Sequence, residues 1–238
     1  MQVPPQNDVR NQLLAALSPE DYDAVSACLE PVVLHIKDVL IAPDTPIGHV
    51  YFPESGIVST VAVADDAYRI EVGIVGRDGF VGTPLVMGVD RTPFESFVQI
   101  ETTGLRMPAE AFLALVDERP AFRTLLMRYS HVFQIQCAQT ALANGAYDIP
   151  QRLARWLLMC ADRTDGNEFQ LTHEFLSMML GVRRPGVTTA IHLLAGTGMI
   201  HAQRSRITIV DREKLADLAG ESYGVAEREQ ERLITSGG

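Results

Sequence analysis

Residues 171–200 read LTHEFLSMMLGVRRPGVTTAIHLLAGTGMI, a stretch that predicts two short helices joined by a tight turn. Thr172 has a hydroxyl that can cap the first helix by accepting a hydrogen bond from an otherwise unpaired backbone N–H. Gly181 allows the sharp break between the helices. Pro185 falls in the first turn of the second helix, where its missing N–H does no harm. The spacing is typical of a helix-turn-helix, whose second helix enters the major groove of DNA.

The two helices each have one apolar face. In the first helix, we expect the inward residues to be Phe175, Met178 and Met179. In the second, the spacing of three and four residues predicts an inner face of Val187, Ala190, Ile191 and Leu194. The outer face of the second helix is polar and basic, and consists of Arg183, Arg184, Thr188, Thr189 and His192. Arginine suits the two acceptors of guanine, and threonine suits base edges or a thymine methyl, so this face is predicted to read DNA.

Two β-rich segments follow the helices. Residues 199–201 and 206–210 flank a short polar loop, which predicts a hairpin. A helix-turn-helix closed by a hairpin is a winged helix, and Arg204 and Arg206 would then face DNA phosphates. The alternative, a helical hairpin in an ordinary soluble protein, does not account for this wing.

The charge of the chain is unevenly distributed. The 238 residues have a net charge of −10, which by itself argues against a nucleic-acid-binding protein. Residues 1–149, however, contain 9 basic and 19 acidic residues, whereas residues 150–238 contain 11 of each. Within residues 171–206 four arginines accompany a single acid, Glu174. The predicted DNA-binding face is therefore locally positive.

Cysteine usage and hydropathy exclude several classes of protein. Cys28, Cys137 and Cys160 are far apart, which argues against disulfides, a zinc site or an iron–sulfur cluster; we expect no metal site. The N-terminus lacks the pattern of a secretory signal, and no apolar run approaches the roughly 20 residues of a membrane span. We therefore expect a cytoplasmic protein that does not bind membranes.

The front half alternates in hydropathy with period two. Two short helices are expected at residues 8–17 and 19–29. Strands are expected at residues 32–36, 39–41, 49–52, 57–64, 68–75 and 96–101, with a turn at Asp65-Asp66 among others. Many short strands at this spacing predict a small barrel or sandwich.

A helical region begins at Pro108 and is broken near Arg119-Pro120. The helix after the break has two apolar stripes and so needs two packing partners. One would be the β-domain, and the other the same helix of a second subunit. The dimer contacts are expected to be Leu125, Val132, Ile135, Gln139 and Leu142. The alternative is a central core helix of a monomer.

The remaining segments complete the expected order of elements. A hinge is expected at residues 144–146, and a helix capped by Asp148 through residue 162, with Leu153, Trp156, Leu157 and Cys160 inward. Asp211 is expected to cap a last helix to about residue 219. The tail after Gly220 is polar and is expected to fray.

A β-rich domain, a long helix and a winged helix in this order resemble the cyclic-AMP receptor protein and fumarate–nitrate regulator (Crp/Fnr) superfamily of bacterial transcription factors. The most specific part is residues 171–200 followed by RITIVDREKL; HVYFPESGIVS and VGRDGFVG resemble sensor strands of a divergent branch. The resemblance implies an α+β fold: a cyclic-nucleotide-binding-like β-roll at 1–118, a dimerisation helix at 119–145, a winged helix-turn-helix at 146–220 and a tail at 221–238.

The resemblance also implies how DNA is bound. Family members are homodimers that read pseudo-palindromic double-stranded operators with half-sites roughly 34–36 Å apart. Arg184 matches the first base-reading arginine, while Pro185 and Thr189 replace a glutamate and a second arginine, so a different operator is expected. Thr172, Gly181 and Arg183 match phosphate-gripping positions, and Gly186 completes the set of candidate DNA contacts.

The sensor departs from the family pattern. Cyclic-nucleotide binders carry Gly-Glu-Leu followed by Arg-Ser or Arg-Thr about ten residues later; here the residues are Gly82-Thr83-Pro84 and Arg91-Thr92. The glutamate that holds the ribose is missing, and so is the cysteine set of the iron–sulfur branch, so neither cofactor is expected. The candidate effector contacts are Gly82, Thr83, Arg91, Thr92 and Cys137, the last as a thiol or haem ligand or simply a packed side chain.

These observations predict a dimeric, sequence-specific DNA-binding regulator whose N-terminal domain responds to a small-molecule effector, with RNA polymerase as a further partner if it activates transcription. The alternative is a ligand-independent DNA-binding or scaffold protein that uses its β-domain for dimerisation or protein contacts. No enzyme is expected, because the sequence lacks phosphate-loop, nucleophile-elbow and His-Glu-x-x-His motifs.

Overall fold

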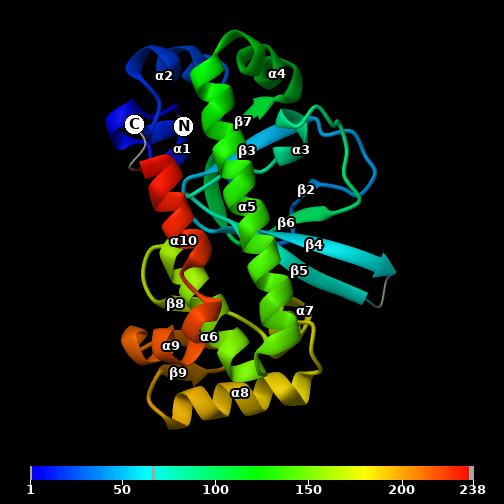
Figure 1. Ribbon diagram of the computed structural model, residues 1–238, viewed down its shortest axis with the longest axis vertical. Helices are drawn as coiled ribbons and strands as arrows, with labels where there is room; N and C mark the ends of the chain where they lie inside the picture. Colours follow the sequence, from blue (N-terminus) through cyan, green and yellow to red (C-terminus); the bar gives the residue numbers. More distant parts are fainter. Residues whose placement is uncertain (1, 66–67, 236–238) are drawn as a thin grey trace.

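The computed structural model describes residues 2–65 and 68–235 and divides into a β-rich sensor domain, a long helix and a reading head (Figure 1). The sensor and the reading head lie at opposite ends of the long axis, and α5 (Pro120–Ala146) runs along most of it. Among the described residues, no helix is long and apolar enough to cross a membrane.

The sensor contains two antiparallel sheets. One has the order β1-β7-β3, with β1 at Glu30–Leu34, β7 at Thr102–Pro108 and β3 at His49–Pro53. The other has the order β2-β6-β4-β5, with β2 at Val39–Ile41, β6 at Glu95–Ile100, β4 at Ile57–Asp65 and β5 at Tyr68–Val75. The six expected strands are confirmed, whereas β7 was not expected. Of the turn expected at Asp65-Asp66, Asp65 ends β4 and Asp66 lies outside the described residues.

The sensor core is aromatic. Phe80 lies between Phe52, Phe112 and Tyr129, with ring centroids 5.4 to 5.9 Å apart. Short helices close the domain: η1 (Gln6–Asp8), α1 (Gln12–Ala15), α2 (Pro19–Ser26), α3 (Thr83–Val86) and α4 (Ala109–Glu118). The first expected helix, 8–17, shrinks to the single turn α1, and α3 was not expected from the sequence.

The long helix follows α4 after a break at Arg119, as expected. The hinge expected at residues 144–146 is wrong in position, since Asn144 and Gly145 are still helical and α5 ends at Ala146. The chain turns at Tyr147 and Asp148, which are extended. Asp148 caps the next helix by accepting a bond from the Gln151 N–H at 3.0 Å, and the Gln151 side chain accepts from the Asp148 N–H.

The reading head is a winged helix. It contains α6 (Ile149–Arg163), α7 (His173–Leu180), α8 (Arg184–Gly196) and α9 (Arg212–Ala219), together with a three-stranded sheet of order β8-β10-β9 (Glu168–Gln170, Arg206–Ile209, Ile200–Gln203). The expected inner faces of α6 and α8 are confirmed as buried. In α7 Met179 is buried as expected, and Phe175 and Met178 are partly buried and pack against the same core, to which Leu176 and Leu180 also belong.

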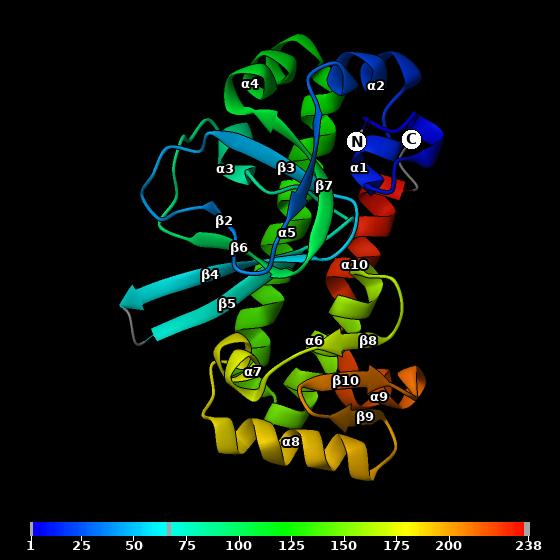
Figure 2. The same cartoon turned by 180° about the vertical axis from the view of Figure 1, so that it is seen from behind.

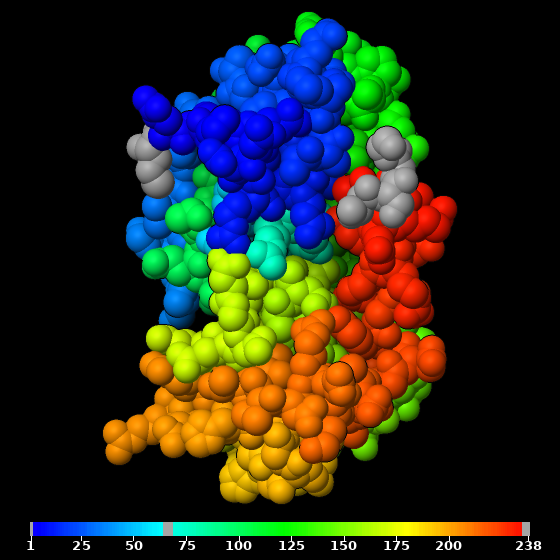
Figure 3. All heavy atoms as spheres, turned by 90° about the vertical axis from the view of Figure 1, so that its left-hand side faces the viewer, coloured from blue at the N-terminus to red at the C-terminus, as the bar shows by residue number. Residues whose placement is uncertain are grey.

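The C-terminal segment is not frayed, so that expectation is wrong for its described part. After the turn η2 (Gly220–Ser222), α10 (Val225–Gln230) and the π-helical turn η3 (Glu231–Thr235) pack against α5. Ala226 and Ile234 are buried there, and the Arg128 guanidinium donates to the Leu233 carbonyl at 3.3 Å. Figure 3 shows this segment, in red, running from the reading head towards the N-terminal residues.

Candidate nucleic-acid interface

Helix α8 lies along the end of the molecule opposite α2 and α4 (Figures 1 and 2). Its inner residues hold it on the reading head, because Val187, Ala190 and Leu194 are fully buried. The expected DNA contacts on its other side are exposed or partly exposed: Arg183, Arg184, Gly186, Thr188, Thr189 and His192. The structure therefore presents these side chains to solvent as one surface.

The N-terminus of α8 concentrates positive charge. Arg183 is its N-cap residue, and its guanidinium, which carries no acceptor, cannot pair with the free N–H groups of the first turn. Within the described part of the chain, neither Arg183 nor Arg184 forms an ion pair. Two unpaired guanidinium groups at the positive end of a helix dipole form a site suited to phosphate and to guanine.

The two threonines of α8 have committed hydroxyl hydrogens. Thr188 donates to the Arg184 carbonyl at 3.1 Å, and Thr189 donates to the Pro185 carbonyl at 3.0 Å. The Thr188 oxygen also lies 3.0 Å from the Nδ1 of His173, so it is the exposed Thr189 that can offer a base both an acceptor oxygen and a methyl group. These suit the amino group of adenine or cytosine and the methyl group of thymine.

The start of α7 is built as expected. Thr172 is exposed, and its hydroxyl oxygen accepts from the Phe175 N–H at 3.1 Å. Gly181 ends the helix with φ of 59°, in the left-handed region that favours glycine. Thr172 and Gly181, which flank α7, are both exposed, and Gly181 lies two residues before Arg183.

The wing is a two-residue hairpin. Arg204 and Ser205 have φ of 34° and 66°, which two-residue hairpins require at both central positions. The Leu171 N–H donates to the Ser205 carbonyl at 2.7 Å and so ties the wing to the start of α7. Arg204 is exposed, whereas Arg206 lies 3.0 Å from Glu168 in a half-exposed pair that stabilises little.

The expected effector residues of the sensor are not gathered into one site by any described hydrogen bond or ion pair. Gly82 is the N-cap of α3 with φ of 123°, beside Val50. Arg91 is exposed and pairs with its neighbour Asp90 at 3.0 Å. The Thr92 hydroxyl accepts from the Phe94 N–H at 3.3 Å, within the same loop.

Cys137 lies on α5 and is partly buried. Burial raises the pKa of its thiol to about 11, against which nearby Arg155 acts. The thiol is therefore protonated at neutral pH, as a packed side chain would be. No group of three or more His, Cys, Asp or Glu side chains that could hold a metal occurs among the described residues.

The expected dimer stripe is not one exposed face. Leu125 and Val132 are 9% and 4% exposed within a single chain, so the expectation is wrong for these two. Ile135 and Gln139 are partly exposed, and Leu142 is half exposed. The apolar residues of α5 that were assigned to a partner are in part covered by the chain itself.

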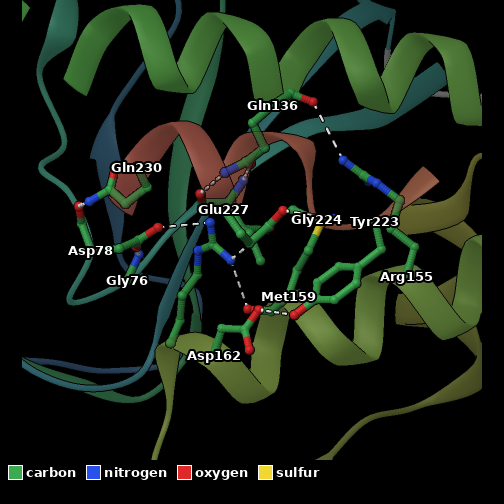
Figure 4. Close-up of polar contacts among 12 residues, drawn as sticks. Gly76, Asp78, Gln136, Arg155, Met159, Asp162, Tyr223, Gly224, Glu227 and Gln230 are labelled. Atoms are coloured by element: carbon green, nitrogen blue, oxygen red, sulfur yellow. Dashed lines mark hydrogen bonds and ion pairs between the residues drawn. The ribbon is translucent and has the colours of Figure 1, made fainter. Parts of the chain in front are cut away.

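A buried ionic cluster joins the sensor, the reading head and the C-terminal segment (Figure 4). Arg163 at the end of α6 lies 2.7 Å from Asp78 of the sensor and 3.9 Å from Glu227 of α10. Burial opposes the charge of Arg163, but Asp78, Glu227 and Asp162 outweigh it and raise its pKa. Gly76 packs directly on this arginine, since a Cβ added there would lie 2.5 Å from the Arg163 Cβ.

Further polar contacts extend the cluster. Gln230 donates to the Asp78 carbonyl at 2.7 Å, and Tyr223 donates to Asp162 at 2.7 Å. Arg155 donates to the Gln136 carbonyl of α5 at 3.5 Å. The C-terminal segment therefore contacts both halves of the molecule.

Sequence reasoning missed this cluster and the carboxylate of Glu71. Glu71 lies on β5 at the contact with the reading head, where it accepts from Ser59 and from Trp156, each at 2.7 Å. The only available signal was the placement of Asp78 and Glu71 in stretches that are otherwise apolar or glycine-rich. Such a placement cannot identify partners that lie more than 80 residues away in the sequence, as Trp156 and Arg163 do.

Comparison with known proteins agrees with this arrangement. A model of the cyclic nucleotide-binding domain matches residues 31–119, and a model of the Crp-like helix-turn-helix domain matches residues 151–218. Over 215 residues the chain is 23% identical to the CRP-like cAMP-activated global transcriptional regulator of Mycobacterium tuberculosis, covering 87% of this chain and 96% of that protein. The chain belongs to the Crp/Fnr family. It is thus a Crp-like transcriptional regulator, in a family of regulators and not of enzymes.

Solved structures of Crp/Fnr proteins share the fold. A CRP-family transcriptional regulator of Thermus thermophilus superposes with a TM-score of 0.68 at 16% identity, covering 81% of this chain and 98% of that chain. FixK2 of Bradyrhizobium japonicum gives 0.66 at 15% identity, with the same coverage. The c-di-GMP responsive regulator CLP of Xanthomonas campestris gives 0.64 at 17% identity, covering 81% and 99%.

Proposed function

We propose that this Crp/Fnr protein binds DNA as a homodimer, reads a pseudo-palindromic operator with α8, and is controlled through its sensor domain. The observation that carries the proposal is the exposed N-terminus of α8, where Arg183 and Arg184 lie without ion-pair partners among the described residues. As a bacterial regulator it would act in the cytoplasm and, if it activates transcription, contact RNA polymerase.

The roles of the DNA contacts follow from their positions. Arg184, on the first turn of α8, is proposed to read guanine, and Thr189 to read a neighbouring base through its methyl group and acceptor oxygen. Arg183, Thr172 and Gly181 are proposed to bind phosphate at the start and end of the helices. Arg204 would bind phosphate from the wing.

Dimerisation is proposed to use the exposed face of α5. Met127, Gln134 and Ala141 are exposed at intervals of seven residues, and so is Ala138 between them. A seven-residue repeat is the spacing with which two helices pair along their length. Ile135, Gln139 and Leu142 border this face.

Control by the sensor would act through contacts that already join it to the reading head. The Glu71–Trp156 and Asp78–Arg163 contacts fix the orientation of α6 on the sensor. An effector changes this orientation only if it binds with different affinity to the state in which α6 contacts the sensor and to a state in which these contacts are broken. Similar proteins are named for different effectors, cAMP in one and c-di-GMP in another, and the effector of this chain is proposed to be a small molecule.

The test is selection of bound sequences from a random duplex library by the purified full-length protein. We expect a two-fold symmetric site. Arg184→Ala should lower affinity for that site by about 1–3 kcal/mol and relax one base pair of each half-site. The matched control is Arg232→Ala, an exposed arginine of the C-terminal segment that pairs with Glu229, which should leave binding unchanged.

Failure to enrich a site, both alone and with extract of the source cell, would overturn the proposal. Enrichment by protein alone, unchanged by extract, would favour the alternative of a ligand-independent DNA-binding protein. If Arg184→Ala binds the operator as tightly as the unaltered protein, α8 is not the helix that reads the DNA sequence.

A further inference from the structure

The C-terminal segment of residues 221–235, here called the strap, links the apolar cores of the two domains. At its start, Tyr223 packs against the core of the reading head, which contains Trp156. At its end, Ile234 is 3% exposed within the core of the sensor, which contains Phe80. Figures 1 and 3 show the strap leading away from α8 towards the N-terminal residues. The chain therefore returns to the sensor after it has formed the reading head.

Hydrogen bonds fix the strap on both domains. In the sensor, the Gln230 side chain donates to the Asp78 carbonyl at 2.7 Å and to the Gln12 side chain at 3.4 Å. In the reading head, Arg155 of α6 donates to the Ser222 carbonyl at 2.8 Å. The strap begins after the last residue matched by either family domain, so neither domain accounts for it.

The strap belongs to the second of two regions that hold the reading head on the sensor. In the first region, Trp156 of α6 donates to Glu71 of β5. In the second, Arg163 at the end of α6 pairs with Asp78 of the sensor and with Glu227 of the strap. The seven residues between Trp156 and Arg163 separate the two regions by about 10 Å along the helix. Two separate regions fix the orientation of a rigid body, whereas a single region lets it pivot.

The strap has little stability of its own. Its two helical pieces, α10 and η3, have six and five residues, and helices of this length are not stable in water without tertiary contacts. Arg228, Glu231 and Arg232 are exposed, while Ile234 anchors the end of the strap in the sensor core. A short segment held by few buried side chains can open locally while the domains stay folded.

We propose that the closed strap holds the reading head in the orientation that reads a two-fold symmetric operator, and that its local opening weakens operator binding. This inference rests on the proposed function. Two reading heads must present α8 to half-sites at a fixed separation, so any freedom of either head is lost on binding and costs affinity. The closed strap removes this freedom in advance. Binding to a single half-site requires no fixed separation and should not depend on the strap.

The same coupling must act from the DNA on the strap. If the closed strap favours operator binding, bound operator favours the closed strap by the same factor. The first test is amide hydrogen exchange of the unaltered full-length protein. With the selected operator bound, the amides of residues 225–235 should exchange at least about fivefold more slowly. The amides of β1, an edge strand of the sensor, are the control and should not change.

Ile234→Asp should open the strap, because a carboxylate at this buried position must reach water. Its affinity for the two-fold symmetric operator should fall by at least about tenfold, while its affinity for a duplex with one half-site should change by less than about twofold. Arg232→Asp is the matched control, since it introduces the same residue at an exposed position of the strap. This control should bind both duplexes like the unaltered protein.

A third measurement needs no DNA. Trp156 is the single tryptophan and is 3% exposed at the contact with Glu71. A reading head held by one region opens this contact more often than a head held by two. Acrylamide should therefore quench the emission of Trp156 at least about twofold more efficiently in Ile234→Asp than in Arg232→Asp.

Equal operator affinity of the two variants would overturn the proposal, and so would an unchanged exchange of residues 225–235 on operator binding. An equal loss of affinity for the operator and for the single half-site would also overturn it, because the damage would then lie in the head and not in its orientation. If no operator is enriched, the proposed function fails. Equal quenching of Trp156 in the two variants would overturn the role of the strap independently of any DNA.

Discussion

Trp156 of α6 donates its indole N–H to the carboxylate of Glu71 of β5 at 2.7 Å, across the boundary between the reading head and the sensor. Ser59 donates to the other carboxylate oxygen, also at 2.7 Å. Glu71 is 4% exposed, and burial raises its pKa to about 7, although the bonds from Ser59 and Trp156 act in the opposite direction. The contact between the two domains therefore contains a carboxyl group that titrates near neutral pH.

Glu71 should make the stability of the docked protein depend on pH. Its pKa rises from an ordinary 4.5 to about 7, so the folded state holds this proton more tightly than the unfolded chain does. The stabilising contribution is complete below pH 4.5, is lost as pH rises to about 7, and is absent above it. As pH rises across this window, the free energy of unfolding of the unaltered protein should fall by up to roughly 3 kcal/mol relative to that of Glu71→Gln.

The measurement is chemical denaturation of both proteins at intervals of pH spanning this window. Glutamine keeps an acceptor for Trp156 and does not titrate, which isolates the ionisation. Glu101→Gln is the control, since Glu101 is exposed on the sensor and pairs only with His35 among the described residues. If the free energies of unfolding of Glu71→Gln and of the unaltered protein change in parallel with pH, the pH dependence does not come from Glu71.

Asp78→Ala should destabilise the protein by about 3–5 kcal/mol, because it removes the carboxylate 2.7 Å from the buried Arg163 and leaves Glu227, at 3.9 Å, as its nearest described ion-pair partner. Thermal unfolding followed by circular dichroism measures the loss. Asp90→Ala serves as the matched control, because Asp90 is exposed and pairs with the adjacent Arg91. A change in Asp78→Ala no larger than in the control would mean that the cluster does not hold the domains together.

Gly145→Ala should stabilise the protein by about 0.5–1 kcal/mol, because Gly145 is helical and a Cβ there meets no atom within 4 Å. The contrasting change is Gly76→Ala, whose Cβ would collide with Arg163 and should destabilise. Melting temperatures of the two variants test both statements. If Gly145→Ala melts at a lower temperature than the unaltered protein, Gly145 is not simply helical, and the hinge expected at residues 144–146 would be supported.

Ala138→Glu should shift the proposed dimer to monomer, because it places a charge at the centre of the exposed face of α5. Light scattering coupled to size-exclusion chromatography gives the mass directly. Arg123→Glu is a control on the same helix, since Arg123 is exposed near its start, away from that centre. A dimer that survives Ala138→Glu would place the interface elsewhere.

The reading head could be predicted almost completely from residues 171–211. Its signals are local, since a cap at Thr172, a left-handed glycine at Gly181 and a spacing of three and four residues act within one or two turns. The strand β8 was not expected, because three residues are too few to show an alternation of polar and apolar side chains. The burial of Leu176 and Leu180 was not expected, because the spacing of three and four residues was read only for Phe175, Met178 and Met179.

The sequence by itself therefore determined the order of the sensor, long helix and reading head, the basic face of α8 and the family, all of which rest on neighbours along the chain. Only the tertiary structure decided which charged side chains are buried and which distant residues they contact. Nothing local distinguishes Arg163 from a surface arginine, or Glu71 from a solvated glutamate, because burial is a property of the whole fold. The same holds for residues 221–235, whose polar composition predicted fraying, while packing of Ala226 and Ile234 on the rest of the chain orders them.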